Sequence, residues 1–180
     1  IPLDESVTGP VLVHPQGTAV YVPTRSSILE IDTRSRTVVR SLPVGGASLL
    51  QISSDGLHLY AAGQIDSPDR NALVDIDARA YSVRASLPLP APPSGLVLLP
   101  DNSKLYVPLY QTADSEGTVY VYDPHQLQFI RQIPVRLTGT LAPDPTGRLL
   151  YASARDSVPV ISTVTDTVVA SIFVNRLQFG

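Results

Sequence analysis

The stretch YVPTRSSILEIDTRSRTVVRSLPVGG runs from Tyr21 to Gly46, and a similar stretch, YASARDSVPVISTVTDTVVASIFV, runs from Tyr151 to Val174. In both, short runs rich in Val and Ile are separated by clusters of Ser, Thr, Asp and Arg. Runs of this length and composition between turn-forming residues predict β-strands. No window of the chain shows a convincing helical period. The sequence therefore predicts β-structure built from a repeated unit.

Alignment on tyrosine shows four such units. Tyr21, Tyr60, Tyr106 and Tyr151 recur at intervals of 39, 46 and 45 residues, and each follows Val or Leu. Each belongs to an expected strand that follows a turn ending in Gly or Asn, residues that supply the positive φ of a tight hairpin. These turn residues are Gly17, Gly56, Asn102 and Gly147. A period in this range, built from short strands, is typical of the blades of a β-propeller.

Each unit holds four expected strands. First strands are expected at 11–13, 49–52, 96–99 and 141–142, and second strands at 18–23, 57–62, 103–108 and 148–153. Third strands are expected at 28–32, 72–77, 118–123 and 158–162, and fourth strands at 37–44, 81–89, 128–135 and 167–174. The third strands of the first three units end in Asp, whose carboxylate can bond the backbone of the next turn. The prediction is an all-β propeller array over residues 1–180, with four-stranded blades at about 8–44, 47–89, 94–135 and 139–174.

The repeat resembles the YVTN-type β-propeller family. HPQGTAVYVP (14–23), IDTRSRTVV (31–39) and LPVGG (42–46) carry the resemblance best, and the fourth unit keeps TGRLLYAS (146–153) and TDTVVASI (165–172) but has Ser162 in place of the Asp. The resemblance implies a fold more than a function. The family includes surface-layer and adhesion-type proteins, periplasmic binding proteins and subunits of quinone-linked dehydrogenases. Its members usually carry more blades than these four.

Four blades leave three ways to complete the array. They could close into a ring alone, two copies could form an eight-bladed ring with two-fold symmetry, or the chain could be part of a longer propeller. An open arc exposes apolar blade faces that something must cover. We favour an incomplete array that a second copy, as a homodimer, or further sequence completes.

Composition limits the function classes. The chain has 43% hydrophobic residues, 16% charged residues, a net charge of −3 and no Cys. These values argue against a disordered chain and exclude disulfides and thiolate metal sites. Without a basic cluster, nucleic acid is not an expected partner, and the short apolar runs predict no membrane span.

Charged residues gather in the loops between second and third strands, a class of loop that shares a face of a propeller with the loops joining one blade to the next. Arg25 and Arg155 occupy the same repeat position in the two short loops. If two copies closed a ring, this pair could meet across the seam and hold an anion or a partner's carboxylates. The alternative is that they are solvated turn residues. The two long loops, 63–71 and 111–117, add the candidate binding residues Asp66, Asp69, Arg70, Asp114 and Glu116.

Other residue patterns favour structural roles. His14, His58 and His125 lie in three units without the spacing of metal ligands, which predicts surface histidines and no metal site. The acidic loops could bind Ca²⁺ but lack the ligand density of a calcium loop. Asp75 is expected to have no strong partner. The periodic tyrosines are expected in the core between blades, whereas a functional reading would stack sugars or a quinone on them.

The sequence thus predicts a non-enzymatic scaffold or binding module outside the cytoplasm, with a protein or carbohydrate partner and no cofactor. The alternative is a non-catalytic or cofactor-holding part of a quinone-linked dehydrogenase assembly, as the family resemblance implies, or a fragment of a longer propeller. No catalytic residue is assigned.

Overall fold

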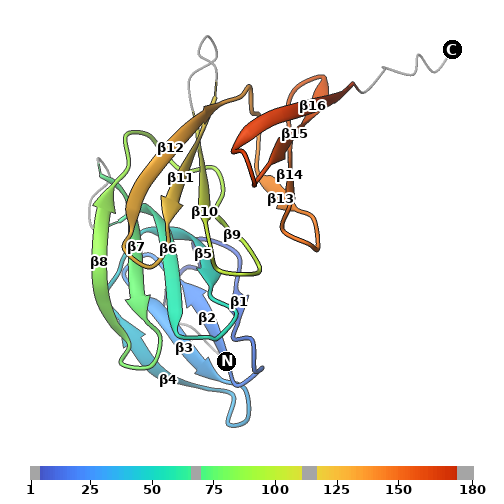
Figure 1. The fold of residues 1–180 in the computed structure, drawn as a ribbon. Coiled ribbons are helices and arrows are strands. Elements are labelled where there is room, and N and C mark those ends of the chain that lie inside the picture. The colour runs from blue at the N-terminus through green and yellow to red at the C-terminus, as the bar shows by residue number, and fades with distance from the viewer. Residues whose placement is uncertain (1–4, 66–69, 111–116, 174–180) are drawn as a thin grey trace, which may run out of the picture.

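The computed structural model describes residues 5–65, 70–110 and 117–173. These residues form sixteen strands in four antiparallel sheets, each of four strands (Figure 1). The expected all-β plan of four-stranded units is confirmed. No helix among the described residues is long and apolar enough to cross a membrane.

Each sheet is a meander in which the strands lie side by side in chain order, and we call the sheets blades 1 to 4. Blade 1 contains β1 (Leu12–Val13), β2 (Ala19–Pro23), β3 (Ile28–Asp32) and β4 (Thr37–Leu42). Blade 2 contains β5 (Ala47–Ile52), β6 (His58–Gln64), β7 (Asn71–Asp77) and β8 (Ser82–Pro88). Blade 3 contains β9 (Val97–Leu98), β10 (Leu105–Leu109), β11 (Thr118–Asp123) and β12 (Gln128–Pro134). Blade 4 contains β13 (Leu141–Pro143), β14 (Leu149–Ala152), β15 (Ser157–Ser162) and β16 (Thr167–Phe173).

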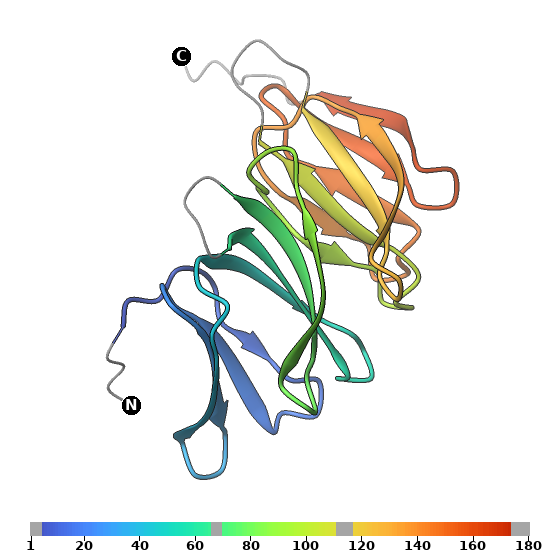
Figure 2. The same ribbon diagram turned by 90° about the vertical axis from the view of Figure 1, so that its left-hand side faces the viewer.

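The blades follow one another in an open array. Figures 1 and 2 place blade 1 and blade 4 at its opposite ends. Three clusters of buried apolar side chains lie between blades 1 and 2, blades 2 and 3, and blades 3 and 4. The described residues therefore do not form the self-closed four-blade ring that was one of the three ways to complete the array.

The tight turns have the expected chemistry. Gly17, Gly56, Asn102 and Gly147 have φ values of +69°, +76°, +58° and +69°. After the third strand of blade 1, Asp32 Oδ1 accepts hydrogen bonds from the backbone N–H groups of Arg34 (3.0 Å) and Ser35 (2.6 Å). The third-strand aspartates of blades 2 and 3 bond their turns in the same way. Short-range sequence signals thus set both turn types.

The turn between the third and fourth strands also carries a feature that the sequence did not reveal. Its last residue has a left-handed backbone in every blade although none of the four is Gly. They are Arg36, Tyr81, Leu127 and Asp166, with φ between 53° and 58°. Such a backbone costs an ordinary residue about 1–2 kcal/mol, which a contact made by the side chain can offset.

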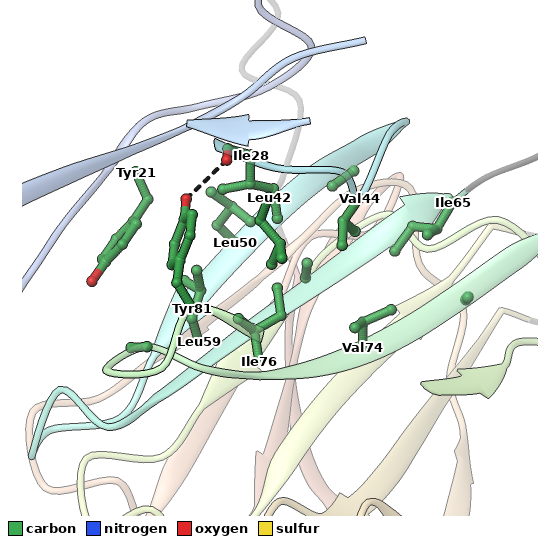
Figure 3. Close-up of a cluster of buried hydrophobic side chains, with 14 of the residues drawn as sticks. Tyr21, Ile28, Leu42, Val44, Leu50, Leu59, Ile65, Val74, Ile76 and Tyr81 are labelled. Atoms are coloured by element: carbon green, nitrogen blue, oxygen red, sulfur yellow. Dashed lines mark hydrogen bonds between the residues drawn. The ribbon is translucent and has the colours of Figure 1, made fainter. Parts of the chain in front are cut away.

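In blades 2 to 4 the turn residue lies against the strand-two tyrosine of the preceding blade. The rings of Tyr21 and Tyr81 stack with centroids 6.3 Å apart, and the Tyr81 hydroxyl donates to the carbonyl of Ile28 at 2.8 Å (Figure 3). The Tyr106 hydroxyl donates to Asp166 Oδ1 at 2.6 Å. Between blades 2 and 3, Tyr60 and Leu127 share one core cluster, and the Tyr60 hydroxyl donates to the carbonyl of Pro124 in the same turn at 3.2 Å.

The expectation that the periodic tyrosines are core residues is confirmed for three of them. Tyr21, Tyr60 and Tyr106 are at most 1% exposed. Tyr151, in the last blade, is only partly buried. The tyrosine position is therefore a joint between successive blades.

A β-bulge interrupts the fourth strand of every blade. In blade 1, Glu30 pairs with Arg40 and Ile31 pairs with Val38, so Val39 is left over. The same shift occurs in the other three blades, where the extra residues are Arg84, Ile130 and Val169. A bulge bends a strand and increases its twist, and here it does so on the outer strand of each blade.

Close packing at Gly46 fixes how the loops of blades 1 and 2 meet. A Cβ at this position would lie 2.0 Å from the carbonyl oxygen of Gln64, and φ is +78°. The Gly46 N–H donates to the carbonyl of Arg25 at 3.1 Å. The glycine therefore holds the connection between blades against the loops on both sides.

We expect Tyr106→Phe to destabilise the chain by about 1–2 kcal/mol, because the buried carboxylate of Asp166 loses a hydrogen-bond donor. Urea denaturation measures the change in the free energy of unfolding. Tyr110→Phe is the matched control, since Tyr110 is 63% exposed. Equal stability of the two variants would contradict a joint at the tyrosine position.

We expect the free energy of unfolding to fall in acid partly through the turn aspartates. The backbone N–H of Ala80, with that of Arg79, lowers the pKa of Asp77, and the N–H of Ser35 does the same for Asp32. A lowered pKa in the folded state gives stability that is present above the unfolded pKa of about 3.9 and is lost as pH falls through the folded value. Asp77→Asn, which keeps an acceptor oxygen, should reduce the loss of stability between neutral pH and acid. If the free energy of unfolding of the variant fell with pH as steeply as that of the parent chain, this role would be contradicted.

We expect Gly46→Ala to be far more destabilising than Gly17→Ala. Both glycines have positive φ, but a Cβ at Gly17 meets nothing within 4 Å. Gly17→Ala should therefore cost only the backbone strain of about 1–2 kcal/mol, whereas Gly46→Ala adds a clash with backbone. Thermal unfolding of the two variants separates strain from close packing, and similar melting temperatures would refute the close approach.

Candidate functional site

A cavity of about 1030 Å³ opens on one face of the array, between blades 1 and 2 and the start of blade 3. The loops between second and third strands reach it with Arg25 and Ser26 from blade 1 and with Gln64 and Asn71 from blade 2. The connections between blades reach it with the segments around Gly46 and Pro92. The two loop classes therefore share this face, which we call the loop face.

The blade 1 wall of the cavity is held by a carboxylate. Glu5 accepts hydrogen bonds from the Thr24 hydroxyl at 2.7 Å, from the Ser26 N–H at 3.2 Å and from the Ser26 hydroxyl. The hydrogen bond from the Ser26 side chain, followed by that from Thr24, lowers the pKa of Glu5. The carboxylate is therefore charged at neutral pH and fixes the short loop that carries Arg25.

Arg25 presents a free cation to the cavity. Its side chain is exposed, and among the described residues it forms no ion pair. Its backbone carbonyl is occupied by the Gly46 N–H. The loop is thus fixed while the guanidinium keeps its five donors for an anion from outside.

Asn71, which also lines the cavity, has an unpaired acceptor. Its Oδ1 is buried and has no hydrogen-bond partner, the one such side-chain atom found among the described residues. The backbone is satisfied, because Asn71 pairs with Gln64 in the sheet and its carbonyl accepts from Leu89 N–H at 2.8 Å. Leaving a buried acceptor unpaired costs about 1–3 kcal/mol. A donor that enters the cavity would recover that free energy.

The structure brings together only part of the predicted site. Arg25 lines the cavity, and Arg70 is an exposed residue next to Asn71. Arg155 is exposed in the equivalent loop of blade 4, at the far end of the array, so the two predicted arginines do not meet within one chain (Figure 1). The remaining candidates, Asp66, Asp69, Asp114 and Glu116, lie outside the described residues.

Asn71 was not predicted from the sequence. Its position at the end of a long loop gave no sign that its amide oxygen would be buried without a partner. Its surroundings include a contact that local sequence does not reveal, because its backbone carbonyl accepts from the N–H of Leu89, 18 residues further along the chain.

On the opposite face, Asp75 was expected to have no strong partner and His58 to be a surface histidine, and both expectations were wrong. Asp75 is 3% exposed, and its Oδ1 lies 3.1 Å from His58 Nδ1. Arg84 Nε lies 3.5 Å from the other carboxylate oxygen. His58 stacks on Tyr60 with ring centroids 6.0 Å apart, and His125 of the next blade meets it edge-on at 6.0 Å. The cross-strand pairing of Tyr60 with Asp75 brings these residues together, and that register is set by packing rather than by spacing.

Charged pairs occupy the same region at the other seams between blades. Arg40 pairs with the buried Glu30 and donates to the carbonyls of Ala78 and Arg79 in blade 2. Lys104 of blade 3 pairs with Asp166 of blade 4 at 2.7 Å. No group of three or more His, Asp or Glu side chains in the described ranges could hold a metal ion. This face therefore ties blades together, and the loop face carries the unpaired groups.

Comparison with known proteins shows the fold. No protein-family model and no curated protein matches the sequence. Among solved structures, hydrazine synthase of Kuenenia stuttgartiensis matches with a TM-score of 0.78 and 19% identity over 97% of this chain and 52% of the other. The Cps50 (Swd1) β-propeller domain of Myceliophteria thermophila matches with a TM-score of 0.77 and 15% identity over 97% of this chain and 59% of the other.

A dihydro-heme d1 dehydrogenase, NirN, in complex with DHE, matches with a TM-score of 0.77 and 22% identity over 97% of this chain and 38% of the other. The chain thus spans about 40–60% of the length of the structures that it resembles. At these identities the likeness shows the architecture alone, and that architecture is the β-propeller.

Proposed function

We propose that this chain is a non-enzymatic β-propeller binding module of the YVTN type, and that its loop-face cavity takes an acidic segment of a protein partner. One observation carries the proposal: the cavity is lined by an unpaired arginine and by Asn71, the residue whose buried amide oxygen has no partner. The family resemblance supports a place outside the cytoplasm.

The Arg25 guanidinium and the Asn71 amide oxygen match two groups of an acidic peptide segment, which are a side-chain carboxylate and a backbone N–H. A guanidinium binds a carboxylate through two parallel hydrogen bonds, and its geometry suits this ligand better than an ammonium does. The oxygen of Asn71 can accept the N–H of an extended backbone. Pro43, Pro92 and Pro93 add apolar surface for the remaining atoms of the segment.

A peptide suits the cavity better than a sugar. A hydroxyl could satisfy Asn71 and a sugar acid could satisfy Arg25, but the described lining has no aromatic ring on which a sugar could stack. The described lining also has the hydroxyls of Thr8, Ser26 and Ser48 without a histidine to activate them, so binding is favoured over nucleophilic catalysis.

We expect a fluorescently labelled hexaglutamate peptide to bind this chain more tightly than hexaglutamine, with affinity that falls as salt rises. Fluorescence anisotropy measures both. Arg25→Ala should weaken hexaglutamate binding about tenfold, because charge-assisted hydrogen bonds contribute about 1.5–3 kcal/mol. Arg34→Ala, which removes an exposed arginine from the turn between β3 and β4 outside the cavity, is the matched control. Equal loss in both variants would indicate attraction by net charge alone and would refute the site.

Asn71→Leu provides an independent readout. It removes a buried acceptor that has no partner while roughly keeping the side-chain volume, so the melting temperature should rise while hexaglutamate affinity falls. A structural role for Asn71 would instead lower the melting temperature, which would overturn its assignment to binding.

A further inference from the structure

The two ends of the array expose matching halves of one interface. We call the side of a blade that meets the following blade its forward face and the other side its backward face. The forward face of blade 4 carries Tyr151 and Val158, both only partly buried. The residues at the Val158 position in blades 1 to 3 are fully buried, at 0% exposure: Ile28, Leu73 and Val119. The apolar forward face of blade 4 is thus built for packing and lacks a partner within the described chain.

The backward face of blade 1 shows the complementary pattern. Val20 and Ile31 are partly buried. Their equivalents in the other blades are at most 2% exposed: Leu59, Leu105 and Leu150 at the first position, and Ile76, Tyr122 and Ile161 at the second. Blade 1 therefore keeps the apolar residues that its relatives in the same chain use to pack against a preceding blade.

The turn between β3 and β4 of blade 1 has the same conformation as the equivalent turns that pack against a preceding blade. Asp32 makes the same hydrogen bonds to its turn as Asp77 and Asp123 do to theirs. Arg36 has φ +58°, close to the +53° to +55° of Tyr81, Leu127 and Asp166. Its side chain is exposed, and among the described residues no cation–π contact joins it to a tyrosine ring. A strained backbone is held here without the contact that accompanies it elsewhere.

We propose that a second copy of this chain supplies the missing partner, so that blade 1 of one copy docks on blade 4 of the other and Tyr151 meets Arg36. A guanidinium over a tyrosine ring is a favourable pair, and the chain already contains one, with Arg40 Cζ 4.6 Å from the Tyr81 ring centre. With both ends engaged, two copies form a closed pair, and the interface continues the three that the chain forms internally.

A second contact at the loop face has the same repeat. The Thr8 hydroxyl of blade 1 donates to the carbonyl of Ala47 in blade 2 at 2.6 Å, and the Ser94 hydroxyl of blade 3 donates to the carbonyl of Gly139 in blade 4 at 3.2 Å. Thr138 holds the equivalent place in blade 4, where its hydroxyl makes only a 3.4 Å contact with its own blade. In the docked pair it would donate to the carbonyl of Gly9 in the second copy.

The test is the mass of this chain in solution, measured by sedimentation equilibrium across a range of concentrations. We expect a species of twice the 19.3 kDa chain mass. Tyr151→Ala should raise the dissociation constant of the pair about 30-fold, as loss of a buried aromatic anchor does, while Tyr110→Ala should leave it unchanged. Open assemblies of more than two copies that Tyr151→Ala dissolves would also support the docking contact. A monomer at all concentrations, or a dimer indifferent to Tyr151→Ala, would overturn the proposal.

Substitutions at position 36 separate docking from folding. Arg36→Gly keeps the left-handed turn and relieves its strain, so the monomer should be at least as stable while dimerisation weakens about tenfold. Arg36→Asp should keep the dimer, because it recreates across the seam the pairing of Tyr106 with Asp166. Arg148→Ala controls for charge, since the equivalents of Arg148 in the other blades, Thr18, Leu57 and Ser103, are all exposed. Equal dimer dissociation constants for the Arg36→Gly variant and the parent chain would exclude Arg36 from the contact and overturn the proposed pairing.

Discussion

The contact between a strand-two tyrosine and the left-handed turn residue of the next blade determines how this array is built. It requires a tyrosine whose ring points forward, a turn that places its last residue at positive φ, and an aspartate or a similar group that holds the turn. Each blade supplies one half of the contact to the blade before it and the other half to the blade after it. A blade therefore has a direction, and the repeat propagates because each unit contains both halves.

The chemistry of this contact changes from seam to seam while its geometry does not. Tyr21 meets an aromatic ring, Tyr60 meets a backbone carbonyl beside a buried Leu, and Tyr106 meets a carboxylate. Polar contacts across the seams vary likewise: Arg40 of blade 1 donates to the carbonyls of Ala78 and Arg79 in blade 2, and Lys104 of blade 3 pairs with Asp166 of blade 4. The seam between blades 3 and 4 is specific for its own neighbour, because a blade inserted out of order would leave the buried carboxylate of Asp166 without Lys104.

The parts of the fold that depend on local chemistry could be predicted from the sequence, and the parts that depend on contacts between blades could not. Strand positions, the positive φ of Gly17 and the hydrogen bonds of Asp32 follow from residues a few positions apart. The left-handed backbone of Tyr81 does not, because its cost is offset by a ring 60 residues away. The partners of Asp75 depend on a register set by packing.

The candidate site shows the same division. Arg25 could be singled out because its loop repeats in blade 4, whereas the unpaired oxygen of Asn71 arises from burial that no spacing reveals. The cavity that joins them spans blades 1 and 2, and Gly46 holds their loops together there. A ligand that bridges Arg25 and Asn71 would thus bind the two blades in one arrangement and stabilise their seam by mass action. Binding and blade packing are therefore linked. A ligand would stabilise the seam between blades 1 and 2 at the loop face, and the buried ring of Tyr21 already stabilises the same seam by stacking on Tyr81.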